Sequence, residues 1–255
     1  MSILEAFLIM LAGVGAGTIN TIVGSGTLIT FPTLLFFGYP PLVANMSNNV
    51  GLLPGGLSGV YGYRRELAGY GAVVRRLVPL SVAGGLTGAL LLLVLPSSVF
   101  DAVVPALIGL GVLLVIFGPR LQAAARARHA EQESSLRRAL LPLAVLGSGV
   151  YGGYFGAAQG VIMMGFLTML MPISLQSLTA IKNVLVPIVN LVAAVVFISL
   201  RWSQIDWAAA GLIGVGSLMG GFIGAGVGRR LPSPVLRGVI ITVGLIAIAK
   251  LTVFG

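Results

Sequence analysis

Two closely similar glycine-rich segments limit the fold of this chain more than any single motif does. Residues 81–89 read Ser-Val-Ala-Gly-Gly-Leu-Thr-Gly-Ala, and residues 217–225, 136 positions later, read Ser-Leu-Met-Gly-Gly-Phe-Ile-Gly-Ala. Other pairs recur at similar spacing: Leu95-Pro96-Ser97 and Leu231-Pro232-Ser233, Gly15 and Gly149, Gly26 and Gly160, and Asn49 and Asn183. Two related hydrophobic halves that face each other are typical of secondary transporters, whose substrate site lies between the repeats.

The composition indicates that this chain lies in a lipid bilayer. Hydrophobic residues make up 57% of the chain and charged residues 8%, whereas a soluble domain has about 25% charged residues. The mean hydropathy is +1.07. The chain also has 37 glycines, and small residues let helices approach closely in a membrane. We therefore predict an all-α integral membrane protein, with the glycine faces around Gly84 and Gly220 serving as helix contacts.

Eight apolar regions are long enough to cross the roughly 30 Å hydrocarbon core as helices. Their continuous apolar character excludes barrel strands, in which apolar and polar residues alternate. The regions are 3–38, 42–62, 73–95, 99–117, 139–171, 175–199, 206–228 and 234–254. The sequence thus predicts two homologous helical repeats of four to five membrane segments each, at 1–118 and 139–255, joined by a cytoplasmic linker at 119–138. Because no basic leader precedes the first region, we expect it to be retained as a membrane helix.

Basic residues in the loops predict the orientation of the chain. They gather between the second and third regions, at Arg64, Arg65, Arg75 and Arg76, and in the linker 119–138, so both connections should be cytoplasmic. The net charge of +9 is explained by this rule, without a nucleic-acid partner. Inverted repeats would leave twelve basic residues inside and two outside, and parallel repeats eleven and three. The difference favours the inverted arrangement only slightly.

The first apolar region of each half is interrupted. Gly24-Ser25-Gly26-Thr27 divides the first, and Ala157-Ala158-Gln159-Gly160 divides the fifth. Non-helical backbone at membrane depth survives only where it is buried in protein or lines a wet cavity, and the N-terminal end of a half-helix attracts anions. We therefore predict broken or re-entrant helices that form an anion site. The alternative is that the glycines only kink a helix for packing.

Polar residues follow each interrupted region. Asn45, Ser47, Asn48 and Asn49 open the second region, and Lys182 and Asn183 occupy the corresponding part of the sixth. A lysine at the centre of a membrane helix costs about 2.5–3.5 kcal/mol even on the lenient insertion scale, so it is a functional candidate. We expect Lys182 to lie across the repeat interface from Asn48 and to compensate the charge of an anion. The alternative is that its flexible stem carries the ammonium to the membrane surface.

An enzyme is not predicted. The chain has no cysteine, which excludes thiolate chemistry and cysteine-bound metals. Its six acids, Glu5, Glu66, Asp101, Glu131, Glu133 and Asp206, lie in or near predicted loops and form no intramembrane pair. His129 is expected to be a solvated linker residue. No cofactor and no metal are therefore expected.

The chain resembles the TauE/SafE sulfite exporter family, also called the 4-toluene sulfonate uptake permease family. The resemblance rests on the glycine-rich break followed by Phe31-Pro32-Thr33-Leu34-Leu35, on Gly38-Tyr39-Pro40 before the polar turn at 44–49, and on the second-half echo from Gly160 to Asn183. In the second half, Ala157-Ala158-Gln159 departs from the glycine-rich pattern.

The resemblance implies a multi-pass carrier of the inner membrane for sulfur-containing anions or small organic acids, such as sulfite, sulfonates or sulfoacetate. The two facing halves predict transport by alternating access at their interface. A passive anion facilitator and a carrier of small carboxylates remain open, and an assembly subunit without flux is a further alternative. The expected partners are a small anion and the lipid bilayer, with a homo-oligomer left open. The candidate substrate-binding residues are Gly24, Ser25, Gly26, Thr27, Asn48, Asn49, Gln159, Gly160, Lys182 and Asn183.

Overall fold

The computed structural model describes residues 1–127, 134–227, 238, 240–246 and 249, and these residues are predominantly helical. The predicted all-α fold is confirmed. In chain order the helices are α1 (Ile3–Ile22), α2 (Thr27–Phe36), α3 (Pro41–Gly62), α4 (Gly71–Val94), α5 (Ser97–Ala127), α6 (Ser134–Tyr154), α7 (Gln159–Leu170), α8 (Leu175–Arg201), the short 3₁₀ helix η1 (Trp202–Gln204) and α9 (Trp207–Val227). Five helices of the described part are long and apolar enough to cross a membrane.

Local sequence signals fix several helix ends. Ser2 and Glu5 form a capping box at the start of α1, in which each side chain bonds the backbone of the other residue. Such reciprocal bonds satisfy N–H groups that would otherwise lack partners. Pro41 occupies the first turn of α3, where its missing N–H has no consequence. The hydroxyl of Ser174 caps α8 by accepting a bond from the N–H of Ser177 (3.1 Å).

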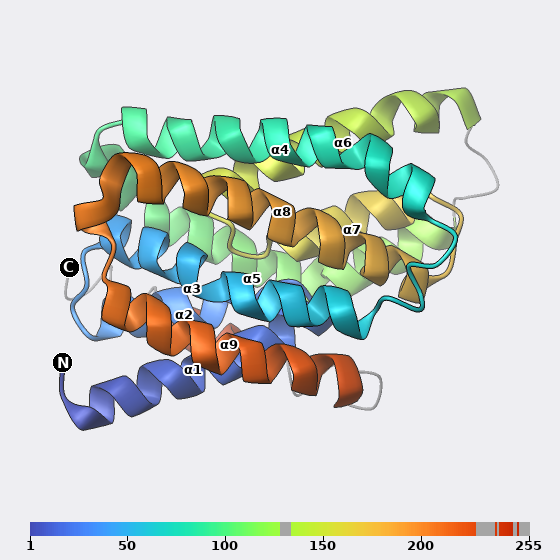
Figure 1. Cartoon of the computed structure of the whole chain (residues 1–255). Helices are drawn as coiled ribbons and strands as arrows, with labels where there is room; N and C mark the ends of the chain where they lie inside the picture. Colours follow the sequence, from blue (N-terminus) through green and yellow to red (C-terminus); the bar gives the residue numbers. More distant parts are fainter. Residues whose placement is uncertain (128–133, 228–237, 239, 247–248, 250–255) are drawn as a thin grey trace.

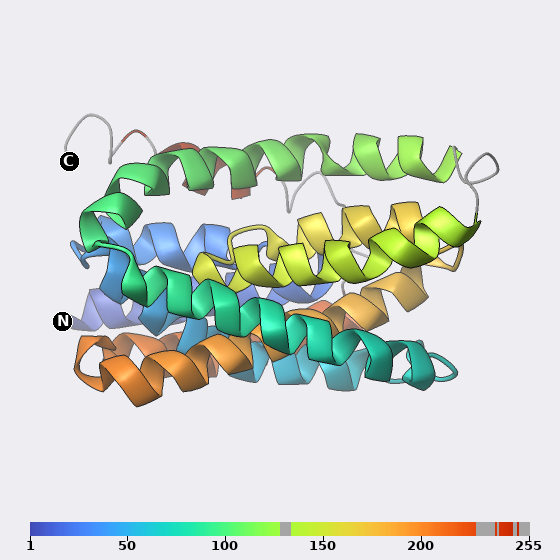
Figure 2. The same cartoon turned by 90° about the horizontal axis from the view of Figure 1, so that it is seen from above.

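The two halves run in opposite directions (Figures 1 and 2). α1 starts near the N-terminus and runs toward the α3–α4 connection, whereas α6 starts at that same end and runs back. After each break the shorter helix, α2 or α7, reverses direction. This course favours the inverted, five-segment interpretation of the sequence, although most of the eighth apolar region, 234–254, lies outside the described residues.

Helices of different halves pack together through their small residues. α1 packs along α9, and α6 packs along α4. A Cβ added to Gly220 would lie 2.0 Å from the carbonyl oxygen of Val14, and one added to Gly88 would lie 2.1 Å from that of Val150. These backbones therefore touch, which confirms the predicted role of the glycine faces in helix contacts.

The spacing between corresponding elements grows along the chain, in a way that is consistent with the repeat. The left-handed glycines of the two breaks, Gly24 and Gly156, are 132 residues apart. α3 and α8 begin at Pro41 and Leu175, 134 apart, and α4 and α9 begin at Gly71 and Trp207, 136 apart. Two short insertions in the second half account for the difference: α7 is two residues longer than α2 (12 against 10), and the remaining two residues enter between the starts of α8 and α9.

Most arginines with described side chains lie at one end of the bundle. Exposed Arg64 and Arg65 lie in the α3–α4 connection, Arg75 and Arg76 in the first turns of α4, and Arg120 near the end of α5. We call this the basic end; it lies at the right of Figure 1. Arg201 lies at the opposite end.

The linker predicted at 119–138 is largely helical. α5 continues to Ala127 and α6 begins at Ser134, because the Ala- and Arg-rich sequence favours helix beyond the membrane. Residues 128–133, with His129, lie outside the described residues. The division into domains at this linker stays a prediction.

Candidate functional site

The first break lies between α1 and α2, where Gly24 takes a left-handed conformation (φ +90°). The N–H groups of Val23 and Gly24 both bond the carbonyl of Ile19 and close the last turn of α1. Ser25 and Thr27 are buried. The break predicted at Gly24–Thr27 is thus present, with Thr27 as the first residue of α2.

The second break lies at 155–158, about two residues before the predicted position. Gly156 and Ala158 both have positive φ, +79° and +57°. Gln159 and Gly160 therefore belong to the first turn of α7, which corrects their predicted place in the interruption itself. The internal repeat in the sequence pairs Gly160 with Gly26. The positive φ angles instead pair Gly156 with Gly24.

The first break touches the start of α7, through Gly24 and Gly160. The N–H of Gly160 donates to the carbonyl oxygen of Gly24 (2.9 Å). A Cβ added to either glycine would lie 2.4 Å from the α-carbon of the other, and one added to Gly26 would lie 2.4 Å from the carbonyl oxygen of Ala16. Close backbone approach therefore explains all three glycines. This supports the alternative that these glycines serve helix packing.

Few free N–H groups remain at the start of α7. The N–H of Gln159 bonds the carbonyl of Gly156 (3.2 Å), that of Gly160 bonds Gly24, and that of Val161 bonds Ala158 (2.9 Å). In this conformation the half-helix attracts an anion through its dipole, while these three N–H groups are already engaged.

Asparagines of α3 fasten both breaks. The Asn45 amide donates to the carbonyl oxygen of Tyr154 at the end of α6 (3.1 Å). The Asn48 amide donates to the hydroxyl of Thr27 (3.3 Å), and its carbonyl accepts a short bond from Thr30. α3 thus connects the end of α6 with the start of α2.

On α8, Lys182 and Asn183 bind the end of α1. The Lys182 Nζ donates to the carbonyl oxygens of Asn20 (3.0 Å) and Thr21 (3.4 Å), and the Asn183 amide donates to Thr21 (3.1 Å). Lys182 is 1% exposed, so its ammonium does not reach the membrane surface. Lys182 and Asn48 do not bond each other: one holds α1 and the other holds α2.

Two cavities adjoin this region. A cavity of about 10 Å³ lies beside Lys182, between the end of α1, Gly55–Gly59 of α3 and α8, and a space of that size holds about one water. A larger cavity of about 420 Å³ lies among α5, α7 and α8, and reaches Ile22 and Val23 at the first break; Gln122 and Thr179 are its polar lining residues.

Comparison with known proteins agrees with this arrangement. The profile of the family described as sulfite exporter TauE/SafE matches residues 9–251. The chain belongs to the TauE/SafE family. It is thus a multi-pass membrane protein from a family of membrane transporters, which is not a class of enzyme.

Three relatives of the TauE/SafE chain align along almost their whole lengths. A "Probable membrane transporter protein" of Haemophilus influenzae is 27% identical over 94% of this chain and 91% of its own. YfcA of Escherichia coli K12, which carries the same description, is 28% identical over 92% and 85%. A similarly described ORF9 protein of Sinorhizobium sp. is 29% identical over 95% and 90%. No solved structure matches the chain.

Several buried polar atoms of the candidate site residues have no protein partner. They are the Ser25 hydroxyl, the Asn49 side-chain oxygen and both amide atoms of Gln159. An unsatisfied buried polar group costs about 1–3 kcal/mol, so each of these groups lowers the stability of the protein unless a ligand or water bonds it. Asn20, Thr21 and Asn45 also belong to the site and were not among the predicted ligands. Of these, only Asn45 had a signal in the sequence, as part of the polar run 45–49.

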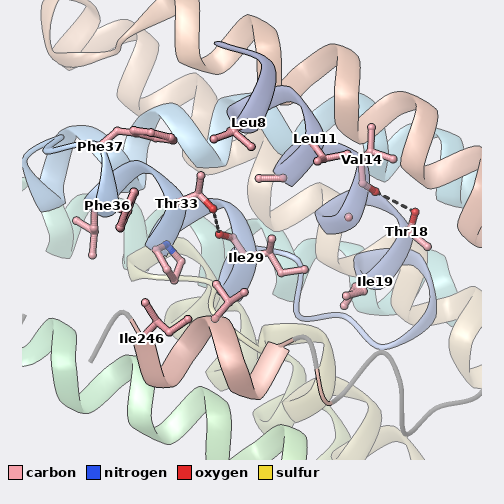
Figure 3. A pocket seen from close by; sticks show the side chains of 15 residues that line it. Leu8, Leu11, Val14, Thr18, Ile19, Ile29, Thr33, Phe36, Phe37 and Ile246 are labelled. Atoms are coloured by element: carbon pink, nitrogen blue, oxygen red, sulfur yellow. Dashed lines mark hydrogen bonds between the residues drawn. The ribbon is translucent and has the colours of Figure 1, made fainter. Parts of the chain in front are cut away.

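A further cavity has a different character (Figure 3). It has a volume of about 680 Å³ and is lined by apolar side chains of α1, α2 and the segment 240–246. Its two hydroxyls turn back to their own helices: Thr18 donates to Val14 (2.9 Å) and Thr33 to Ile29 (2.8 Å). The protons of both hydroxyls are therefore already engaged and are not available to an anion, and we exclude this cavity from the site.

Proposed function

We propose that the chain is a secondary carrier of small sulfur-containing anions, such as sulfite, sulfonates or sulfoacetate, in the inner membrane. The observation that carries this proposal is the contact of two broken helices at Gly24 and Gly160. Discontinuous helices that meet near the midplane are the usual framework of a carrier site. The family description, sulfite exporter, supports this substrate class.

The charges around the contact suit an anion. The N-terminal ends of α2 and α7 begin at the breaks, and each contributes the positive end of a helix dipole. Lys182, whose ammonium bonds the last turn of α1 before the first break, adds a full positive charge. Taking an anion out of water is tolerable only where it is paired and hydrogen-bonded. The unpartnered Ser25 hydroxyl and Gln159 amide nitrogen can donate such hydrogen bonds.

The cavities support alternating access. The 420 Å³ cavity reaches the first break from the basic end, which the positive-inside rule assigns to the cytoplasm. The polar cavity beside Lys182 holds about one water, so a polyatomic anion needs a movement of α1 or α8 before it can enter. Binding would then be linked to a conformational change of the two breaks.

Uptake into liposomes tests this function. The purified protein should accumulate labelled sulfite above the outside concentration when a proton gradient is imposed. Strictly downhill flux would identify a passive facilitator instead, and the absence of any flux would identify a subunit without transport activity. Thermal unfolding with sulfite, sulfonates, sulfoacetate and simple carboxylates in parallel would rank the substrates, because a ligand of the native state raises stability with its concentration.

A further inference from the structure

The ammonium of Lys182 occupies an unusual place: the carbonyl end of a broken helix. Its two partners, the carbonyl oxygens of Asn20 and Thr21, belong to the last turn of α1. That end carries the negative pole of the helix dipole. In carriers with discontinuous helices, such carbonyls at half-helix ends coordinate the coupling cation. The side chain of Lys182 therefore stands where a free cation would bind.

The surroundings of the ammonium are those of a cation site. The cavity beside it is lined by Asn20, Thr21, Gly55, Gly56, Gly59, Asn183, Val186 and Pro187. This lining contains no carboxylate, and the ammonium's bonds in the described part of the chain go to main-chain oxygens. The positive charge is thus balanced by oxygen dipoles, as for a coordinated monovalent cation, and none of the described acids pairs with it.

At the end of α6, which corresponds to the end of α1, the group that bonds the carbonyl is neutral. There the Asn45 amide donates to the carbonyl of Tyr154. Asn45 lies on α3 of the first half, just as Lys182 lies on α8 of the second half. Each break is thus capped from the other half, by a charge in one case and by an amide in the other. The site carries one fixed positive charge, which suits one anion.

We propose that Lys182 is a tethered replacement for the coupling cation, and that its side chain fills a monovalent-cation site formed by the end of α1, α3 and α8. This inference rests on the proposed carrier function. Its consequence is that anion transport does not require sodium. Removal of the side chain back to Cβ should vacate the site and make it available to a small external cation.

The first experiment uses the unaltered protein. Sulfite flux into liposomes is measured with sodium as the external cation and again with N-methyl-D-glucamine, which is too large for the site. Equal fluxes are expected. Flux that occurs only with sodium would overturn the proposal while leaving the carrier function intact, whereas absence of flux in both media would count against the carrier function itself.

The second experiment uses Lys182→Ala and Lys182→Met. Both remove the charge, but the methionine side chain continues to fill the space. Sulfite flux of both should fall by about tenfold or more, as expected for the loss of a charged hydrogen bond. Methylammonium or sodium should restore flux in Lys182→Ala and leave Lys182→Met unchanged. Equal responses of the two variants would contradict the vacated site.

Thermal unfolding gives a readout that does not depend on sulfite. Methylammonium should raise the midpoint of Lys182→Ala by about 2–4 °C for each kcal/mol of binding, and should leave the unaltered protein and Lys182→Met where they are. If Lys182→Ala requires methylammonium in order to fold at all, that dependence is itself the expected result. If neither methylammonium nor sodium changes the unfolding midpoint of Lys182→Ala, the proposal is overturned.

Discussion

The N–H of Gly160 donates a 2.9 Å hydrogen bond to the carbonyl oxygen of Gly24, so the backbones of the two broken helices are in direct contact. Glycine is required on both sides of this bond, because a Cβ on either residue would lie 2.4 Å from the other's α-carbon. The contact joins residues of different halves and fixes how the breaks face each other.

Gly160→Ala should therefore destabilise the protein. Overpacking typically costs about 1–3 kcal/mol, and here the obstacle is backbone, which cannot rotate away. Gly165→Ala on the same helix is the matched control, since an added Cβ there meets nothing within 4 Å and alanine favours helix by about 1 kcal/mol. Thermal unfolding in detergent measures both. Equal midpoints for the two variants would show that the breaks are not in contact.

Ala158→Gly should leave stability nearly unchanged. Ala158 is fully buried and has φ +57°, a conformation that costs a non-glycine residue about 1–2 kcal/mol. Relief of this strain offsets the loss of a buried methyl, about 0.8 kcal/mol. Ala157→Gly loses the methyl of an equally buried residue without such relief. It should be the less stable variant by about 1 kcal/mol in thermal unfolding; the reverse order would argue against the left-handed turn.

Ser217→Ala and Ser81→Ala should differ, although the two serines are 136 residues apart in matching segments. The Ser217 hydroxyl donates to the carbonyl of Gly51 (2.9 Å) and accepts from the N–H of Gly55 (3.2 Å). The buried Ser81 hydroxyl has no partner. Loss of the first should cost about 1–3 kcal/mol, and loss of the second should be neutral or stabilising. Unfolding midpoints that fall equally would contradict the bonding at Ser217.

Gln159→Leu should make the empty protein more stable and less active. Both amide atoms of Gln159 are buried without a partner, so an apolar side chain removes a penalty of about 1–3 kcal/mol. An anion that uses this amide would lose its ligand. Thr168→Val on the same helix removes another unpartnered buried hydroxyl away from the break. It should share the gain in stability and keep sulfite flux, and a normal flux in Gln159→Leu would remove this residue from the site.

Cysteine labelling checks the orientation of this cysteine-free chain. Ala124 lies exposed near the basic end, and Ser203 lies exposed at the opposite end. In intact cells a membrane-impermeant maleimide should label Ser203→Cys and should reach Ala124→Cys only after permeabilisation. Efficient labelling of Ala124→Cys in intact cells would place the basic end outside, against the positive-inside rule.

The helices could be predicted from the sequence because continuous apolar runs leave few alternatives in lipid. Region 42–62 became α3 (Pro41–Gly62) and region 206–228 became α9 (Trp207–Val227). The second break was predicted about two residues too late, because α7 is longer than α2 by two residues. An alignment anchored on Gly160 and Asn183 cannot detect this insertion.

The partners of the site residues could not be predicted in the same way. Lys182 was identified as a buried charge from its apolar neighbours alone. Its bonds go to main-chain carbonyls of Asn20 and Thr21, more than 160 residues away in the chain. Every residue has a main-chain carbonyl, so the sequence does not indicate which of them accept a bond. Likewise, Gly24 and Gly160 appeared as separate interruptions, and only their packing shows that they meet.

The exchange of helices between the halves has a consequence for assembly. α9 packs with α1 and α3, and α4 packs with α6 and α8, so each of these groups contains helices from both halves of the polypeptide. A fragment that stops between α5 and α6 would lack the partners of the glycine faces, α9 for α1 and α6 and α8 for α4. Two fragments divided there would have to find each other in the bilayer to regain the native structure, and a half-length precursor of this protein would have had to fold as an interlocked pair.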